Sequence, residues 1–116
     1  MQGPLTGVKV LELATMVAAP SCARILSDMG AEVIKVEHPK GDGWRRSAIS
    51  YHPSRYSDDE SPVFDIYNSG KKHIAINLKT EEGMEAFHKL LAQSDVFVTN
   101  TRPAGLKRLG IYYDDL

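Results

Sequence analysis

Four side chains that suit a phosphate-bearing ligand each follow a predicted strand: two lysines, an asparagine and an arginine. They are Lys40, Lys79, Asn100 and Arg102. Ammonium and guanidinium groups bind phosphate through charge-assisted hydrogen bonds, and an amide side chain adds neutral donors. In an open parallel sheet, ligands bind in the crevice outside the carboxyl ends of the strands. The sequence therefore predicts a site for a phosphorylated ligand, if these strands belong to one parallel sheet.

The first third of the sequence predicts a strand, a helix and a second strand. Residues 8–13 and 33–36 are apolar runs of strand length. Between them, residues 20–29 have apolar side chains at helical spacing, with Pro20 in the first turn and Gly30 as the C-terminal cap. Two strands joined through a helix run parallel, and the crossover is almost always right-handed.

The rest of the sequence begins with a long irregular segment, residues 38–61, which is rich in Gly, Pro, Ser, Asp and Arg. Loops of this length in compact domains are more often functional than idle. The elements predicted after it are a short helix over 62–68, a strand over 73–78, a helix capped by Thr80, a strand over 96–98, and a helix over 104–109 ended by Gly110.

This order of elements predicts the α/β class, with an open, mostly parallel, Rossmann-like sheet and helices on both faces. A chain of 116 residues suffices for one domain and one core. No Gly-x-Gly-x-x-Gly motif follows the first strand, which counts against a standard dinucleotide-binding site.

Composition narrows the possible partners. The net charge of −1 argues against nucleic acid, and a hydrophobic share of 42% with a charged share of 25% suggests neither disorder nor a membrane span. Cys22 is the single cysteine, so no disulfide forms within the chain, and the first residues lack the pattern of a signal peptide. We therefore expect a cytoplasmic protein.

Several strings of the sequence, in this order, resemble family III CoA-transferases of the CaiB/BaiF type, which include formyl-CoA transferase. They cover nearly the whole chain and lie at strand ends. The strings are residues 7–13, 17–20, 30–37, 68–72, 77–83 and 95–106. The resemblance implies that residues 1–116 are the amino-terminal part of a CoA-binding Rossmann-like domain, an incomplete large domain without its catalytic segment.

The resemblance also implies which residues contact coenzyme A. They are Val17, Ala18, His38, Ile76, Asn77, Leu78, Lys79, Asn100, Thr101, Arg102 and Arg108. Other roles remain open for several of them. Small residues near Ala18 also permit close packing of helix on sheet, Lys79 also suits a solvated helix start, and Asn100 and Arg102 also suit a turn.

One position departs from the family pattern. Formyl-CoA transferases carry an arginine where this chain has His38. A neutral imidazole supplies one donor where a guanidinium supplies a fork, so we expect a weaker contact there, with Lys40 as its substitute.

The resemblance implies transfer of CoA from an acyl-CoA to a free carboxylic acid through intermediates on an enzyme aspartate, with no metal. No carboxylate of this chain suits that role. Asp95 precedes its strand, Asp28 lies on a helix, and the others lie in a charged loop or near the C-terminal end: Asp58, Asp59, Glu60, Asp114 and Asp115. We therefore expect no catalytic residue here and a chain that is inactive alone.

For the acid substrate and for the partner subunit, the sequence supports only general predictions. Residues 43–46 with Tyr51 and Tyr56 are candidates for an acyl pocket or a subunit contact, and the resemblance is nearer to relatives acting on hydroxy or aryl acids. Family members form intertwined homodimers, which is the expectation here. Two alternatives stay open: a non-catalytic CoA- or nucleotide-binding module, and a structural assembly piece.

Overall fold

The strands form one parallel sheet in the part of the chain that the structure describes. The computed structural model describes residues 2–46 and 61–116. Its strands are β1 (Lys9–Leu13), β2 (Glu32–Glu37), β3 (Lys72–Ala75) and β4 (Val96–Thr99), in the order β3-β2-β1-β4. Every neighbouring pair is parallel, which confirms the predicted fold class.

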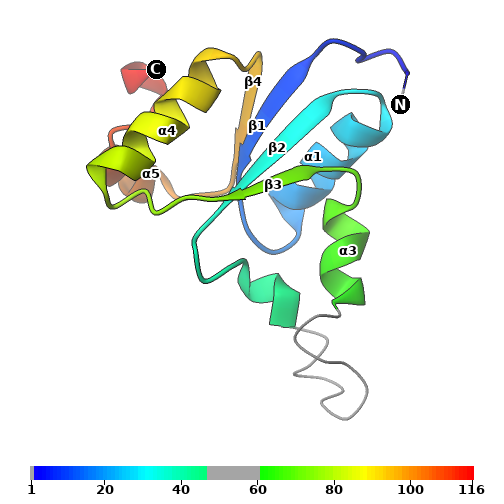
Figure 1. The fold of residues 1–116 in the computed structure, drawn as a ribbon, viewed down its shortest axis with the longest axis horizontal. Coiled ribbons are helices and arrows are strands. Elements are labelled where there is room, and N and C mark those ends of the chain that lie inside the picture. Colours follow the sequence, from blue (N-terminus) through cyan, green and yellow to red (C-terminus); the bar gives the residue numbers. More distant parts are fainter. Residues whose placement is uncertain (1, 47–60) are drawn as a thin grey trace.

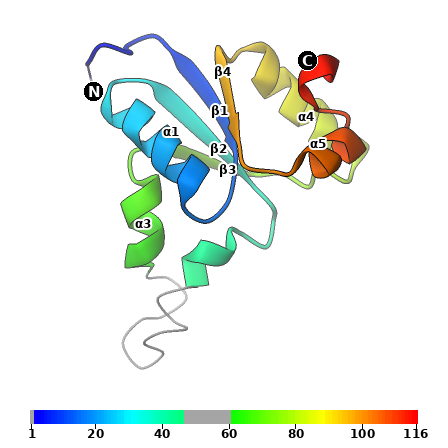
Figure 2. The same ribbon diagram turned by 180° about the vertical axis from the view of Figure 1, so that it is seen from behind.

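Helices cover both faces of this sheet (Figures 1 and 2). On one face lie α1 (Ala18–Asp28) and α3 (Pro62–Asn68), and on the other lie α4 (Glu81–Ala92) and α5 (Pro103–Leu109). The 3₁₀ turn η1 (Gly43–Arg46) follows β2, and η2 (Tyr113–Asp115) ends the chain. Tyr51 and Tyr56, predicted as candidates for an acyl pocket, lie outside the described residues, as do Asp58, Asp59 and Glu60.

The helix ends follow the capping chemistry of the sequence. The Thr80 hydroxyl accepts a hydrogen bond from the backbone N–H of Gly83 at 3.0 Å, which satisfies a free amide of the first turn of α4. Gly110 ends α5 in the left-handed conformation, with φ of 70°, where a glycine has no Cβ penalty. Both predicted caps are confirmed.

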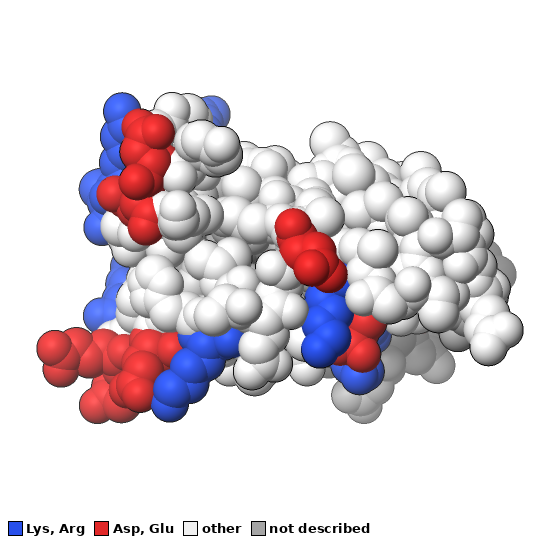
Figure 3. Space-filling model, turned by 90° about the horizontal axis from the view of Figure 1, so that it is seen from above, with Lys and Arg blue, Asp and Glu red and all other residues white. Residues whose placement is uncertain are grey.

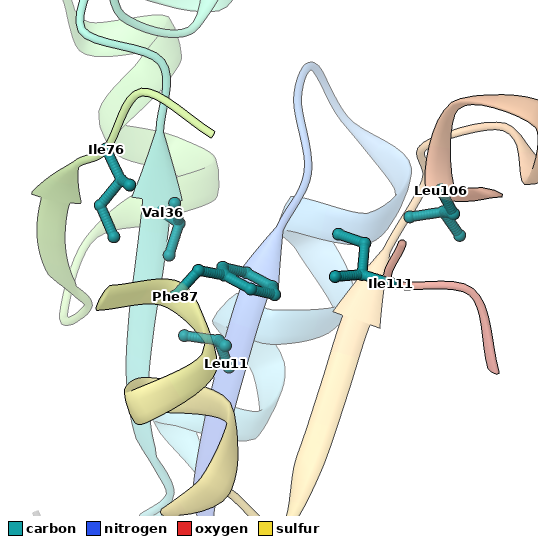
Figure 4. Close-up of a cluster of buried hydrophobic side chains, with 6 residues drawn as sticks. All are labelled: Leu11, Val36, Ile76, Phe87, Leu106 and Ile111. Carbon is teal, nitrogen blue, oxygen red and sulfur yellow. The ribbon is translucent and has the colours of Figure 1, made fainter. Parts of the chain in front are cut away.

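Alternating side chains of β1 and β2 build a core on each face. Leu11 and Val36 point toward α4, where Phe87 is fully buried between them and the residues of α5 (Figure 4). Val10 and Val33 point to the opposite face and pack with Ala23 of α1. The strict alternation fixes which residues of each strand face which helix layer.

The third strand is shorter than predicted. The expected strand over residues 73–78 was wrong in its second half, because β3 ends at Ala75. The Asn77 side chain accepts a hydrogen bond from the backbone N–H of Lys79 at 3.1 Å, a local turn that competes with strand pairing. As a result, residues 76–79 cross the carboxyl end of the sheet.

Charged side chains of both signs lie in separate small groups on the face shown in Figure 3. A broad uncharged area separates some of these groups. Among the described residues, no helix has the length and apolar character needed to span a bilayer.

Candidate functional site at the carboxyl ends of the strands

The direction in which the sheet grows reverses at β1. The chain adds β2 and then β3 on one side of β1, and it returns to place β4 on the other side. The connections after β1 and β4 therefore leave toward opposite faces, since α1 and α5 cover different sides (Figure 1). Such a reversal opens a crevice at the carboxyl ends of the strands, where α/β proteins bind their ligands.

A groove of about 360 Å³ lies at this position. It is lined by the ends of β1 and β2 and by the segments that follow all four described strands. This volume lies within the range of ligand pockets, roughly 300–1,000 Å³. Its lining residues are Leu13, Ala14, Thr15, Val36, Glu37, His38, Gly41, Asp42, Ile76, Asn77, Leu78, Lys79, Asn100, Thr101 and Leu109.

Most residues predicted to contact a ligand line this groove or the hollow beside it. His38, the segment 76–79, Asn100 and Thr101 line the groove itself. Arg108 lines a neighbouring hollow of about 650 Å³, which shares Leu78, Lys79 and Leu109 with the groove. Neither lining includes the predicted contacts Val17, Ala18 and Arg102, which are all exposed. Lys40, the expected substitute for the missing arginine, also lies outside both linings.

His38 uses one ring nitrogen within its own loop. Its Nδ1 accepts a hydrogen bond from the backbone N–H of Lys40 at 3.0 Å. This contact leaves Nε2 as the ring atom that can face a ligand. His38 therefore has one ring nitrogen left for a ligand, and the weaker contact expected in place of a guanidinium stays a prediction.

Beneath the groove lies a cluster of four buried charges, which we call the charge cluster: Glu12, Lys35, Asp42 and Lys71. Lys35 Nζ lies 3.0 Å from Glu12 Oε1 and 3.2 Å from Asp42 Oδ2, and Lys71 Nζ lies 2.7 Å from Glu12 Oε2. Lys71 also donates to Asn68 Oδ1 at 2.8 Å. Two lysines and two carboxylates balance, as buried charges require.

The surroundings of Lys71 act on its proton affinity in opposite directions. Burial lowers the pKa of Lys71 below its ordinary value, and the hydrogen bond to Glu12 works against this effect. The lowering prevails, and the hydrogen bond to Glu12 therefore helps Lys71 to keep its proton.

Glu37 ends β2 beside the charge cluster, where the side chains of Arg45 and His73 hold its carboxylate. Arg45 donates to it through Nη2 at 2.7 Å and through Nε at 2.9 Å, and His73 Nδ1 lies 3.3 Å from Oε1. Burial alone would raise the pKa of Glu37, but the hydrogen bonds from His73 and Arg45 outweigh it and lower the pKa to about 2.

The lowered pKa of Glu37 predicts a loss of stability in acid. The contribution of this carboxylate is fully present above its ordinary pKa of 4.5 and disappears as the pH falls through about 2. Replacing Glu37 by Gln is expected to reduce the free energy of unfolding at neutral pH, with the two proteins converging near pH 2. Urea unfolding at a series of pH values measures the difference.

The control for this prediction is Glu85→Gln. Glu85 pairs with Lys89 on the exposed surface of α4 at 2.9 Å, and exposed pairs contribute little to stability. A Glu37→Gln difference that stays constant between pH 5 and about 2 contradicts the prediction.

The sequence analysis missed several groove residues and the whole charge cluster. Asp42 lies in the loop taken as irregular, and Glu12 and Lys35 lie inside runs taken as apolar strands. A signal was present, since a carboxylate and an ammonium occupy strands that pair, and Glu12 and Lys35 prove to be register partners. In the described part of the chain, no three His, Cys, Asp or Glu side chains gather as a metal site.

The fold and the groove define an open parallel α/β protein of the kind that carries its site at a reversal of strand order. Residues 5–116 match the model of CoA-transferase family III, and the chain belongs to this family. The resemblance of the sequence to family III CoA-transferases is confirmed.

Several relatives are similar to this chain over nearly all of its length. An (R)-2-hydroxy-4-methylpentanoate CoA-transferase of Clostridioides difficile is 50% identical over 97% of this chain and 28% of its own length. A cinnamoyl-CoA:phenyllactate CoA-transferase of Clostridium sporogenes is 43% identical over 96% of this chain and 27% of its own length. The chain thus spans about 28% of the first of these relatives.

A solved structure has the same fold. The crystal structure of a CAIB/BAIF family protein from Brucella suis matches with a TM-score of 0.86 and 38% identity, over 99% of this chain and 30% of that one.

Proposed function

We propose that this chain supplies the CoA-binding part of a CoA-transferase, which moves CoA from an acyl-CoA to a free carboxylic acid. The observation that supports the proposal is the groove lined by the segments that follow all four described strands. The nucleotide end of CoA occupies this groove, with Ile76, Leu78 and Leu109 against its apolar surfaces and His38 at its edge.

The phosphates of CoA extend from the groove into the adjoining hollow. Arg108 lines that hollow from α5, and Lys79 lines both spaces. Arg108 is exposed, and its Nε lies 3.4 Å from the Ala104 carbonyl oxygen on its own helix. Its two terminal nitrogens can therefore form a bidentate contact with phosphate.

The transfer itself runs through intermediates on an aspartate that lies outside the residues described here. The described carboxylates near the groove are already committed: Glu12 and Asp42 pair with buried lysines, and Glu37 pairs with Arg45. Asp95 accepts a hydrogen bond from the Lys9 backbone N–H at the amino end of the sheet, far from the groove. A carboxylate nucleophile must be free to attack a thioester.

A 2-hydroxy acid is the substrate class that we propose for the carboxylate acceptor. This rests on two relatives, whose names include (R)-2-hydroxy-4-methylpentanoate in one case and phenyllactate in the other. An enzyme distinguishes such acids by how well its pocket fits the substituent of the acid and by whether it supplies a hydrogen-bond partner for the 2-hydroxyl group of the acid.

Isothermal titration tests the CoA site directly. CoA is expected to bind, and NAD is expected not to, since the chain lacks the glycine motif for a dinucleotide. Replacing Arg108 by Ala is expected to weaken CoA binding about tenfold, because a charge-assisted contact is lost. A CoA derivative without phosphate at the ribose 3′ position shows which phosphate Arg108 contacts.

The matched control is Lys89→Ala, which removes a cation from the exposed surface of α4, away from the groove. Equal affinities of the Arg108 and Lys89 variants contradict the assignment of Arg108. No CoA binding by the unaltered protein favours a structural assembly piece instead, and CoA binding without any transfer by the protein as its gene encodes it favours a non-catalytic binding module.

A further inference from the structure

The loop between β1 and α1 carries a strained residue next to the groove. Among residues 2–46 and 61–116, Met16 is the one non-glycine residue with positive φ, at 70°. Side chains with a Cβ avoid this left-handed conformation, and it persists only where the surroundings fix it. Met16 is 45% exposed, so packing of its side chain does not account for the conformation.

One set of contacts fixes this loop from the side of β4. Asn100 follows β4 and bonds to both backbone groups of Thr15: its Nδ2 donates to the Thr15 carbonyl oxygen at 2.7 Å, and its Oδ1 accepts from the Thr15 N–H at 3.2 Å. The side-chain amide of Asn100 therefore links the loop after β4 to the loop after β1, where the strand order reverses.

A second set of contacts fixes the loop from below, through the charge cluster. Lys35 Nζ donates to the Ala14 carbonyl oxygen at 2.9 Å, and Asp42 Oδ1 accepts from the Met16 N–H at 3.4 Å. The same oxygen of Asp42 accepts from the Trp44 N–H at 2.9 Å, while Oδ2 pairs with Lys35. The side chains of Lys35 and Asp42 are 0% and 1% exposed.

We propose that Asp42 is a positioning residue of the CoA site, which holds the segment 14–16 in its strained shape with Asn100 as its counterpart. This inference rests on the proposed function. One carboxylate joins the loops after β1 and β2, because it bonds to Met16 and to Trp44, and these loops line the groove through Thr15 and Gly41. Its side chain is too buried to be a main contact of the ligand, so its effect on CoA passes through the loop.

Replacing Asp42 by Ala in the protein as its gene encodes it tests this role. Amide hydrogen exchange without CoA is expected to become about tenfold faster at Met16, while the core amides of Val10 and Val33 keep their rates. CoA affinity is expected to fall about tenfold, since a loosened loop must be ordered on binding. The control is Asp28→Ala, which removes an exposed carboxylate paired with Arg24 on α1.

Asn100→Ala provides a second variant, because Asn100 is exposed and its loss leaves the buried charges intact. It is expected to speed exchange at Met16 as Asp42→Ala does. If Asp42→Ala does not fold, this variant decides the result.

Unchanged exchange at Met16 in the folded variants overturns the inference, and so does faster exchange in Asp42→Ala with unaltered CoA affinity. In both cases the proposed function stands, because the unaltered protein still binds CoA. Absence of CoA binding by the unaltered protein overturns the proposed function and this inference together.

Discussion

Replacing Lys35 by Met is expected to lower the free energy of unfolding by about 3–5 kcal/mol, the range for breaking a buried ion pair from one side. Lys35 is completely buried and lies within 3.2 Å of two carboxylates, those of Glu12 and Asp42. A methionine fills similar space but leaves both carboxylates short of a partner. Lys71 still pairs with Glu12, so the loss falls mainly on Asp42.

The neighbouring strand offers a matched control for this prediction. Lys72 forms an ion pair with Glu32 at the same 3.2 Å, but the two side chains are 69% and 44% exposed. Lys72→Met is therefore expected to cost less than about 1 kcal/mol. Urea denaturation of both variants gives the comparison, and equal losses would show that burial of the charge cluster is unimportant.

Replacing Phe87 by Ala is expected to cost about 3–5 kcal/mol of stability. The Phe87 side chain is fully buried and joins α4 to Leu11, Val36 and the α5 region (Figure 4). Its ring also lies 5.8 Å from that of Phe97, at an edge-to-face angle of 74°. Truncation removes these contacts together and leaves a cavity that the surrounding strands cannot fill.

The exposed residue Ile25 provides the control for Phe87. It is 58% exposed on α1, so Ile25→Ala is expected to change stability by less than about 0.5 kcal/mol. Thermal unfolding and urea unfolding measure both variants. Since small domains have a total stability of about 5–15 kcal/mol, this loss is a large fraction of the total, and the Phe87 variant is expected to unfold at a clearly lower temperature and urea concentration. A cost below about 1 kcal/mol contradicts the central place of Phe87 in the core.

The order and type of the elements could be predicted because local chemistry and burial agree along most of the chain. The helix at Thr80 has both a capping hydroxyl and an apolar stripe, and its structure from Glu81 to Ala92 follows both signals. The helix at 62–68 has the predicted bounds. Alternation in the apolar runs also determined the faces, so Leu11 and Val10 point to opposite layers as the pleat requires.

The end of β3 could not be predicted, because it depends on a competition between two patterns. Residues 73–78 alternate like a strand, yet the Asn77 side chain bonds to the backbone of Lys79 and turns the chain. From the sequence alone, Asn77 could either continue the strand or form this local bond and turn the chain.

The charge cluster was missed for a different reason. Charged residues in strands usually lie on an exposed face, so the opposite charges of Glu12 and Lys35 were a signal that did not by itself indicate burial. Their pairing depends on the register of β1 against β2 and on Asp42, which arrives from a loop. Spacing along the chain does not encode contacts of this kind.

The candidate site was predicted in position but not in the roles of its residues. The carboxyl ends of the strands do meet in one groove, which includes Lys79 and Asn100. The Asn100 side chain is occupied with the backbone of Thr15, however, so its contact with a ligand stays a prediction. Role depends on side-chain orientation, which only the folded chain determines.

The strand order has a consequence for the folding pathway. The register partners of β1 in β2 lie 23 residues away along the chain, as for Lys9 and Glu32, whereas those in β4 lie 86 residues away, as for Val10 and Val96. Closing the longer loop costs more chain entropy, and pairings between distant segments slow folding. The unit of β1, α1 and β2 is therefore expected to form first. The groove then becomes complete only when β4 docks, so the binding surface matures in the last stage of folding.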